Sequence, residues 1–294
     1  MNIDANLVAR LIAKEFPEWV GLQVIPVKES GWDNHSFRLG QALLVRLPSA
    51  ARYAGQVEKE QEWLPKLAPH LPLPVPVPVG KGNPAEGYPW KWSIYRWLDG
   101  ETLSSDKVTN TEKFAEELAQ FLNQLHSIDS SGGPVAGAHN FFRGGSLEVY
   151  DEETQRSIGI LKGDIDSDAV MSLWSDAVTP AWSGPPVWVH GDVATGNLLV
   201  KESKLCAVID FGCLGVGDPA CDLVIAWTFL CGEGRRAFQR AMNVDQGAWV
   251  RARGWAVWKA LITIVEYKES CPAKSSDALR VLVGLLKDRD CQTP

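Results

Sequence analysis

The chain has 294 residues, of which 45% are hydrophobic and 22% are charged, the balance of a folded protein large enough for two lobes. Its formal net charge of −7 at pH 7 argues against nucleic acid as the main partner and favours a cationic small molecule. The best apolar candidate, Leu223–Cys231, is shorter than the roughly eighteen residues that a membrane-spanning helix needs. Because Asp4 stands where a secretion signal carries positive charge, we expect a cytoplasmic protein with no membrane partner.

The first hundred residues predict a small antiparallel sheet accompanied by two helices. Apolar residues recur at helical intervals before Pro17, and prolines at every second position after Leu71 allow only an extended chain. A hairpin turn is expected at residues 39–42. The expected elements are helices at Leu7–Phe16 and Val57–Leu67, strands at Gln23–Val27, Ser36–Leu39, Ala42–Leu47 and Trp92–Trp97, and an extended run at Leu71–Pro78.

Beyond Gly100 the pattern becomes mostly helical. Thr109 and Glu112 have the spacing of a capping box and predict the start of a helix that runs to about Leu125. Further helices are expected at Val170–Val178, Ala220–Leu230, Trp249–Tyr267 and Ala278–Leu286, and short strands at Val187–Val189, Leu198–Val200 and Leu205–Ile209. This order predicts an α+β protein with a small antiparallel lobe over residues 1–97 and a larger, mostly helical lobe over residues 98–294.

The most informative motif lies between the short strands of the larger lobe. Four residues separate Asp192 from Asn197, and an Asp-Phe-Gly segment begins at Asp210. This is the spacing of the catalytic loop and the metal-binding segment of protein kinases. Asp192 is suited to orient an acceptor hydroxyl, and the oxygens of Asn197 and Asp210 are suited to bind Mg²⁺. The motif therefore predicts phosphoryl transfer on a bilobal, protein-kinase-like fold, with the nucleotide bound by residues 1–97 and catalysis and acceptor binding in residues 98–294.

His-Gly-Asp at 190–192, in place of the His-Arg-Asp of protein kinases, resembles the aminoglycoside phosphotransferase family. The resemblance covers nearly the whole chain, and its matching segments include Glu29–Asn34, Leu44–Pro48, Tyr95–Gly100, His190–Asn197 and Ile209–Leu223. It implies a kinase-like fold, ATP as the phosphate donor with GTP as the alternative, and Mg²⁺ as the metal. It also implies that Asp192 is the catalytic residue and that Asn197 and Asp210 bind the metal.

The resemblance extends to the small lobe. It implies that Ser30, Gly31 and Asn34 lie over the nucleotide phosphates, although this segment on its own reads as an ordinary turn. Arg46 stands where most kinases have the phosphate-binding lysine, and Glu60 is its expected partner. A solvent-facing cation on an edge strand is the alternative for Arg46, and a solvated helix face is the alternative for Glu60.

Four further residues are expected at the edge of the site. Residues 94–98 resemble the hinge between kinase lobes, and counting back from Asp99-Gly100 places the backbone contacts to the nucleotide base at Arg96 and Leu98. His190 and Asp222 are interpreted as structural supports of the catalytic loop, without acid–base work. The alternative for His190 is an ordinary buried histidine with satisfied ring nitrogens.

The acceptor is left open by the catalytic motif. We favour a small hydroxylated molecule, an aminoglycoside or another antibiotic, with a metabolite such as an amino alcohol, homoserine or a sugar-like compound as the alternative. A nucleotide-binding pseudokinase is a third candidate, because Arg46 departs from the usual lysine. A protein kinase is disfavoured, since the chain lacks the Gly-rich loop and the Ala-Pro-Glu segment. We expect a monomer or a homodimer.

Two sets of residues bear on the acceptor. A cationic aminoglycoside would require several carboxylates around Asp192, and the candidates, most of them expected on solvated faces, are Glu152, Glu153, Asp164, Asp166, Asp168, Glu233, Glu266 and Glu269. Of the thirteen tryptophans, four lie where they could line an acceptor cleft or fill the core: Trp227, Trp249, Trp255 and Trp258. The helical spacing of the last two favours the core.

Overall fold

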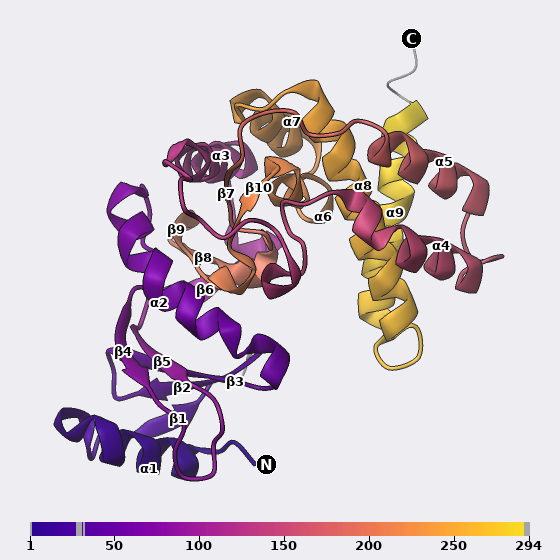
Figure 1. Cartoon of the computed structure of the whole chain (residues 1–294). Coiled ribbons are helices and arrows are strands. Elements are labelled where there is room, and N and C mark those ends of the chain that lie inside the picture. The colour runs from indigo at the N-terminus through magenta and orange to yellow at the C-terminus, as the bar shows by residue number, and fades with distance from the viewer. Residues whose placement is uncertain (1, 28–30, 32, 291–294) are drawn as a thin grey trace.

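The computed structural model describes residues 2–27, 31 and 33–290, and it has a small lobe and a large lobe, as predicted (Figure 1). The small lobe contains the indigo and purple segments around β1 to β5, and the large lobe contains the magenta to yellow segments. Two hydrophobic clusters correspond to this division, one beneath the first helix and sheet and one through the large lobe. The boundary at residues 97/98 falls just after the last strand of the small sheet and remains a prediction.

The small lobe is built on one antiparallel sheet of order β1-β2-β3-β5-β4. Its strands are β1 (Val24–Pro26), β2 (Asn34–Leu39), β3 (Leu43–Pro48), β4 (Pro78–Gly82) and β5 (Trp92–Arg96). Helix α1 (Ala5–Glu15) buries Leu7, Val8, Leu11 and Ile12, the residues of the predicted apolar face. The predicted turn lies between β2 and β3, where Gly40 has a φ of +59°. Strand β4 was not predicted, because its first residue is a proline, which a sheet tolerates only at an edge or at a strand start.

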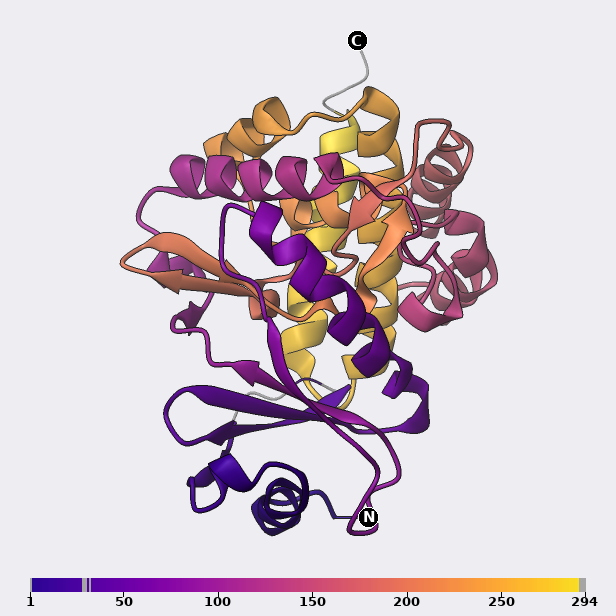
Figure 2. The same ribbon diagram turned by 60° about the vertical axis from the view of Figure 1, so that its left-hand side comes forward.

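Helix α2 (Gly55–Leu67) connects the two lobes. Figure 2 shows it lying obliquely between the small sheet and the large lobe. Its Glu60 is buried, and its Leu64 and Leu67 belong to the hydrophobic cluster of the large lobe. The helix therefore fixes the position of a small-lobe acid relative to the catalytic half of the molecule.

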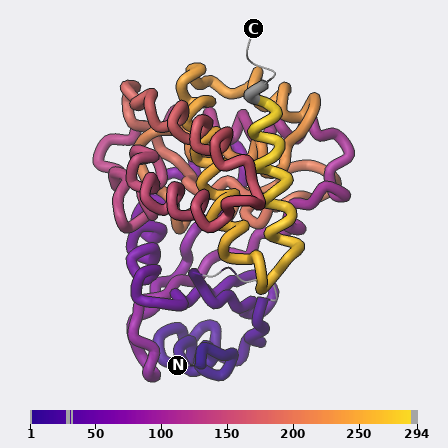
Figure 3. The backbone as a smooth tube through the Cα atoms, turned by 90° about the vertical axis from the view of Figure 1, so that its right-hand side faces the viewer, coloured from indigo at the N-terminus to yellow at the C-terminus, as the bar shows by residue number. Residues whose placement is uncertain are grey.

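The large lobe is mostly helical and contains two small sheets. Its helices are α3 (Thr111–Ser127), α4 (Asp151–Ile160), α5 (Ser167–Val178), α6 (Ile225–Thr228), α7 (Gly232–Ala241), α8 (Gln246–Tyr267) and α9 (Pro272–Asp290). Its strands are β6 (Glu101–Thr102), β7 (Val187–Val189), β8 (Leu198–Lys201), β9 (Lys204–Val208) and β10 (Gly215–Gly217). Helix α8 packs against α4, α5 and α9, and Figure 3 shows this helical group on one side of the lobe. In the described part of the chain, no helix is both long and apolar enough to cross a membrane.

Several predicted boundaries in the large lobe need correction. The cap of α3 is Asn110 rather than Thr109, since the Asn110 side chain accepts a hydrogen bond of 2.9 Å from the backbone of Lys113. The helix predicted over Ala220–Leu230 is instead a 3-10 turn over Pro219–Leu223 followed by the short α6. Helices α8 and α9 both begin earlier than predicted, α8 because Asp245 caps it. Helices α4 and α7 and strands β6 and β10 were not predicted, but a small antiparallel lobe followed by a mostly helical lobe is as expected.

Candidate active site

Asp222 anchors the backbone of the segment between β7 and β8. The two oxygens of this fully buried carboxylate accept hydrogen bonds from the backbone N–H groups of His190, at 2.9 Å, and Gly191, at 2.7 Å. The Nε2 atom of His126 lies 3.2 Å from the same carboxylate. Gly191 has a φ of +83°, and a Cβ atom there would lie 2.5 Å from the carbonyl oxygen of Cys213. The turn that presents Asp192 therefore requires glycine and depends on a buried acceptor.

His190 joins this turn to the strand that precedes Asp210. Its Nδ1 accepts a hydrogen bond of 3.2 Å from the backbone N–H of Asp192, so Nε2 carries the proton and donates to the carbonyl oxygen of Ile209 at 3.0 Å. The ring also contacts the ring of Phe211, with centroids 4.6 Å apart. Both ring nitrogens are occupied by backbone groups, which is the arrangement expected of a scaffold and leaves no nitrogen for acid–base work.

Asp192 and Asn197 face each other across the loop. The Asn197 amide donates to the Asp192 carboxylate at 3.1 Å and to its backbone oxygen at 2.9 Å, and Asn197 Oδ1 accepts no hydrogen bond from a described residue. The second carboxylate oxygen of Asp192 lies 2.7 Å from Nζ of Lys259. Burial raises the pKa of Asp192, but the positive charges of Lys259 and Arg143 outweigh it and lower the pKa to about 2. Asp192 is therefore ionised at neutral pH.

Asp210 follows β9 in an uncommon backbone conformation, with a φ of +65°. One of its carboxylate oxygens lies 2.9 Å from a guanidinium nitrogen of Arg46. Asn197 and Asp210 both line the cavity between the lobes. A carboxylate and an amide oxygen fit Mg²⁺, a hard cation that takes few protein ligands and completes its shell with phosphates and water. The residues present therefore fit a magnesium site.

Arg46 is the centre of a buried charge cluster. It lies 3.5 Å from Glu60 and 3.7 Å from Asp33, in addition to its contact with Asp210, and the Tyr95 hydroxyl donates a hydrogen bond to Glu60. Burial raises the pKa of both Asp33 and Glu60, while Arg46 opposes that rise. Arg46 is only 9% exposed, so the solvent-facing alternative for it is wrong, as it is for Glu60. The cluster has one positively charged guanidinium and three carboxyl groups, so an added cation would stabilise it.

The cavity between the lobes has a volume of about 580 Å³, within the range of small-molecule sites. It brings together Gly31, Arg46, Arg96, Leu98, Asn197 and Asp210, all predicted for the site. A Cβ atom at Gly31 would lie 3.9 Å from the Asp210 carboxylate, so the first hairpin reaches the candidate metal ligand. Asn34 and Glu60 do not line the cavity; the Asn34 amide donates to Asp33 at 2.9 Å. Ser30 lies outside the described residues.

Sequence reasoning missed two cations beside Asp192. Lys259 on α8 and Arg143, in the loop before Leu147, line a small pocket together with Asp192. Neither belongs to a recognisable motif; the usable signal was the pair Trp255 and Trp258, which precede Lys259 in sequence. Both rings are nearly buried, in line with the favoured core interpretation, and they also line this pocket.

The fold and the Asp192–Asn197–Asp210 arrangement define a kinase-like phosphotransferase. The sequence matches the phosphotransferase enzyme family APH over residues 24–261. The chain belongs to this family, as its resemblance predicted, and it is a small-molecule phosphotransferase.

Solved structures confirm the kinase-like fold. A GDP and kanamycin complex of APH(2″)-IIIa has a TM-score of 0.73 at 18% identity, covering 97% of this chain and 99% of that chain. A gentamicin complex of APH(2″)-IIa has a TM-score of 0.62 at 20% identity, covering 100% and 98%. The macrolide 2′-phosphotransferase MphH of Brachybacterium faecium has a TM-score of 0.58 at 20% identity, covering 95% and 97%. No curated protein sequence matches the chain.

Proposed function

We propose that the protein transfers the γ-phosphate of ATP to a hydroxyl group of a small molecule. The acceptor oxygen bonds to the γ-phosphorus as the bond from that phosphorus to the β,γ-bridging oxygen breaks, and ADP leaves. The hydroxyl proton passes to the Asp192 carboxylate and then to solvent. Because the pKa of Asp192 is about 2, its first task is to accept a hydrogen bond from the hydroxyl and aim the oxygen, with proton uptake late.

The observation that carries this proposal is the cavity that joins the two lobes at Asn197 and Asp210. Arg46 on β3 lines this cavity, and Asp192 accepts a hydrogen bond from Asn197, another of its lining residues. In the proposed roles, Asn197 and Asp210 hold Mg²⁺, and Arg46 grips the nucleotide phosphates. Mg²⁺, when bound, neutralises negative charge on the transferring phosphate. Residues 1–97 then act as the nucleotide-binding lobe and residues 98–294 as the catalytic lobe.

The remaining nucleotide contacts are proposed from the family resemblance, and the lining of the same cavity supports them. Arg96 and Leu98 line it at the hinge, where their backbone groups are proposed to bind the base; Gly31 also lines it and is proposed, with Ser30 and Asn34, to contact the phosphates. ATP is the proposed donor and GTP the alternative, since structural relatives are described as complexes with GDP and with ADP. His190 and Asp222 support the loop without taking part in proton transfer.

The proposed acceptor is a small hydroxylated molecule. An antibiotic is supported by relatives described as complexes with kanamycin and gentamicin, and by a relative named as a macrolide 2′-phosphotransferase. A metabolite acceptor is the second candidate, and one observation favours it over an aminoglycoside: none of the eight predicted acidic candidates lines the pocket at Asp192, which holds Arg143 and Lys259 instead. The reaction is proposed to occur in the cytoplasm, by a monomer or a homodimer.

The test is a coupled assay of ADP release from Mg·ATP and Mg·GTP against hydroxylated antibiotics, amino alcohols, sugars and hydroxy acids. Acceptor-dependent ADP release with a phosphorylated product supports the proposal. A protein that binds Mg·ATP but phosphorylates neither an acceptor nor water would instead be a pseudokinase. A protein that binds no nucleotide would refute both.

A further inference from the structure

The small pocket beside Asp192 contains a guanidinium nitrogen that has no hydrogen-bond partner among the described residues. The guanidinium of Arg143 lies 4.5 Å from the ring centroid of Trp258 and 5.1 Å from that of Trp255. Its Nη1 atom is buried and has no hydrogen-bond partner among the described residues. A buried, charged N–H group without an acceptor is costly, so the free protein leaves Arg143 ready for an anionic ligand.

Lys259 adds a second positive charge to this pocket. It bonds to Asp192 at 2.7 Å, which occupies one of its three N–H donors and leaves the others for a ligand. The space between these residues is partly open, and its innermost part is only about 10 Å³, room for a single oxygen atom of a ligand. A carboxylate or phosphate oxygen fits this space, whereas a sugar ring does not.

Lys259 also lines a larger cleft among α6, α8 and α9. This cleft has a volume of about 610 Å³, enough for the body of a small acceptor. The described charged residues that line it are mostly basic: Arg235, Lys259, Lys274, Arg280 and Asp277. Arg235 is paired with Asp288 and Arg280 with Asp277, so an anionic ligand would be bound mainly by Arg143 and Lys259 rather than by the cleft as a whole.

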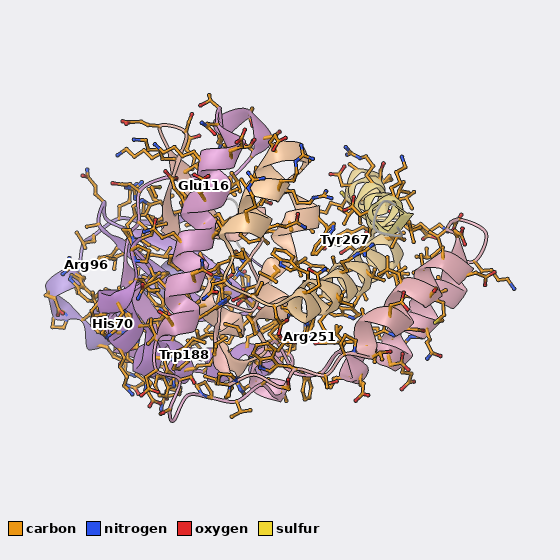
Figure 4. All side chains as sticks on the ribbon, turned by 90° about the horizontal axis from the view of Figure 1, so that it is seen from above. His70, Arg96, Glu116, Trp188, Arg251 and Tyr267 are labelled. Atoms are coloured by element: carbon orange, nitrogen blue, oxygen red, sulfur yellow. The ribbon has the colours of Figure 1, made fainter. Side chains whose placement is uncertain are left out.

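The carboxylates that a polycationic acceptor would need lie elsewhere. None of the eight acidic candidates lines the small pocket or the larger cleft. Glu153 is in contact with the pocket wall, where it accepts a hydrogen bond of 2.7 Å from the indole N–H of Trp258. Asp164 is exposed and paired with Lys268. In Figure 4, Arg251 and Tyr267 mark helix α8, and Arg96, at the end of strand β5 in the small lobe, lies on the opposite side of the molecule.

We propose that the natural acceptor carries an acidic group, a carboxylate or a phosphate, which Arg143 and Lys259 bind beside the hydroxyl that Asp192 orients. The unpartnered Nη1 of Arg143 can donate to one oxygen of such a group, and the tryptophan rings hold the guanidinium in place. This inference rests on the proposed phosphotransfer and adds the chemical class of the acceptor.

The same two cations could serve the transferring phosphate instead, and kinetics separates the two roles. A group that stabilises the transferred phosphate lowers kcat for every acceptor alike. A group that binds the acceptor's own anion changes kcat/KM for anionic acceptors and leaves neutral ones, and the KM for ATP, nearly unchanged.

The experiment uses matched acceptors that differ in charge. Glycerate and gluconate are compared with their amides, and a hexose phosphate with the free hexose, so that carboxylate and phosphate are distinguished; kanamycin is the polycationic member. The proteins are the wild type, Arg143→Met, Arg143→Lys, and the control Lys268→Met, which removes an exposed lysine at the end of the same α8. Thermal unfolding verifies that each variant is folded.

The wild type is expected to prefer one class of anionic acceptor over its neutral partner by roughly 10- to 100-fold in kcat/KM. Arg143→Met should reduce this preference to less than about threefold at unchanged KM for ATP, Arg143→Lys should restore part of it, and Lys268→Met should behave as wild type. A wild type that prefers neutral acceptors or kanamycin would overturn the inference, as would an Arg143→Met variant that slows all acceptors equally.

Binding without turnover separates this inference from the proposed function. Calorimetric titration of the same anions is done with a non-hydrolysable ATP analogue and Mg²⁺ present, which block the nucleotide cavity. Anion binding that is lost in Arg143→Met, without phosphorylation of any acceptor, would refute the phosphotransfer and retain the anion site. Turnover of neutral acceptors together with no anion binding would retain the phosphotransfer and refute the anion site.

Discussion

Replacement of Asp222 by asparagine tests how the catalytic loop is held. The carboxylate accepts two backbone hydrogen bonds, at 2.9 Å from His190 and 2.7 Å from Gly191, in a fully buried position. Asparagine keeps one acceptor and turns an N–H₂ group toward the other donor. One charge-assisted hydrogen bond is lost, and one buried N–H is left unpaired, which together cost about 3 kcal/mol. A change of this size lowers the Tm of a protein of this class by roughly 6–12 °C.

The assay is calorimetry together with urea unfolding followed by tryptophan fluorescence, and kcat with any acceptor found in the screen. The expected loss of kcat is roughly 10²-fold, because the loop that aims Asp192 loses its anchor. The matched control is Asp164→Asn, which removes the same charge from a pair of 2.7 Å in which both side chains are about half exposed. That pair should contribute at most about 1 kcal/mol. Equal stability losses in the two variants would refute the role given to Asp222.

Three further outcomes are expected. Gly191→Ala should lose activity and about 2 kcal/mol or more of stability in urea unfolding, because Gly191 has a φ of +83° and a new Cβ would lie 2.5 Å from a carbonyl oxygen. The control Gly159→Ala, where a new Cβ would meet open space, should be neutral or stabilising. Lys259 helps to hold the pKa of Asp192 at about 2, so the kcat/KM of the wild type should fall only as the pH approaches that value and Asp192 is protonated. In Lys259→Met, burial still raises the pKa of Asp192, so the fall in kcat/KM should begin at higher pH. Arg46→Met should weaken Mg·ATP binding at least about tenfold by calorimetry, and unchanged binding would contradict its proposed phosphate contact.

The local motif explains why much of the candidate site could be predicted. Asp192, Asn197 and Asp210 lie within nineteen residues, so their spacing alone fixes two short loops at one end of β8 and β9. Arg46 and Glu60 needed the resemblance, and the structure adds that Asp33 and Tyr95 complete their cluster.

The rest of the site depends on packing between distant segments. Lys259 reaches Asp192 across 67 positions, and Arg143 reaches the same pocket from an irregular loop, so no periodicity marks either residue. His126 meets Asp222 across 96 positions for the same reason. The role of Asn34 over the phosphates came from the resemblance and remains a proposal; its amide donates a hydrogen bond to the neighbouring Asp33, and it does not line the cavity.

The central claim is that Asp192 directs phosphate from a nucleotide bound between the lobes to a small hydroxylated molecule. The most direct measurement compares the wild type with Asp192→Asn, by mass spectrometry of the acceptor and by calorimetric binding of Mg·ATP. The wild type should add one phosphate to the acceptor, and the variant should bind Mg·ATP normally but transfer phosphate at least roughly 10²-fold more slowly. Phosphate transfer by Asp192→Asn at the wild-type rate would contradict the account.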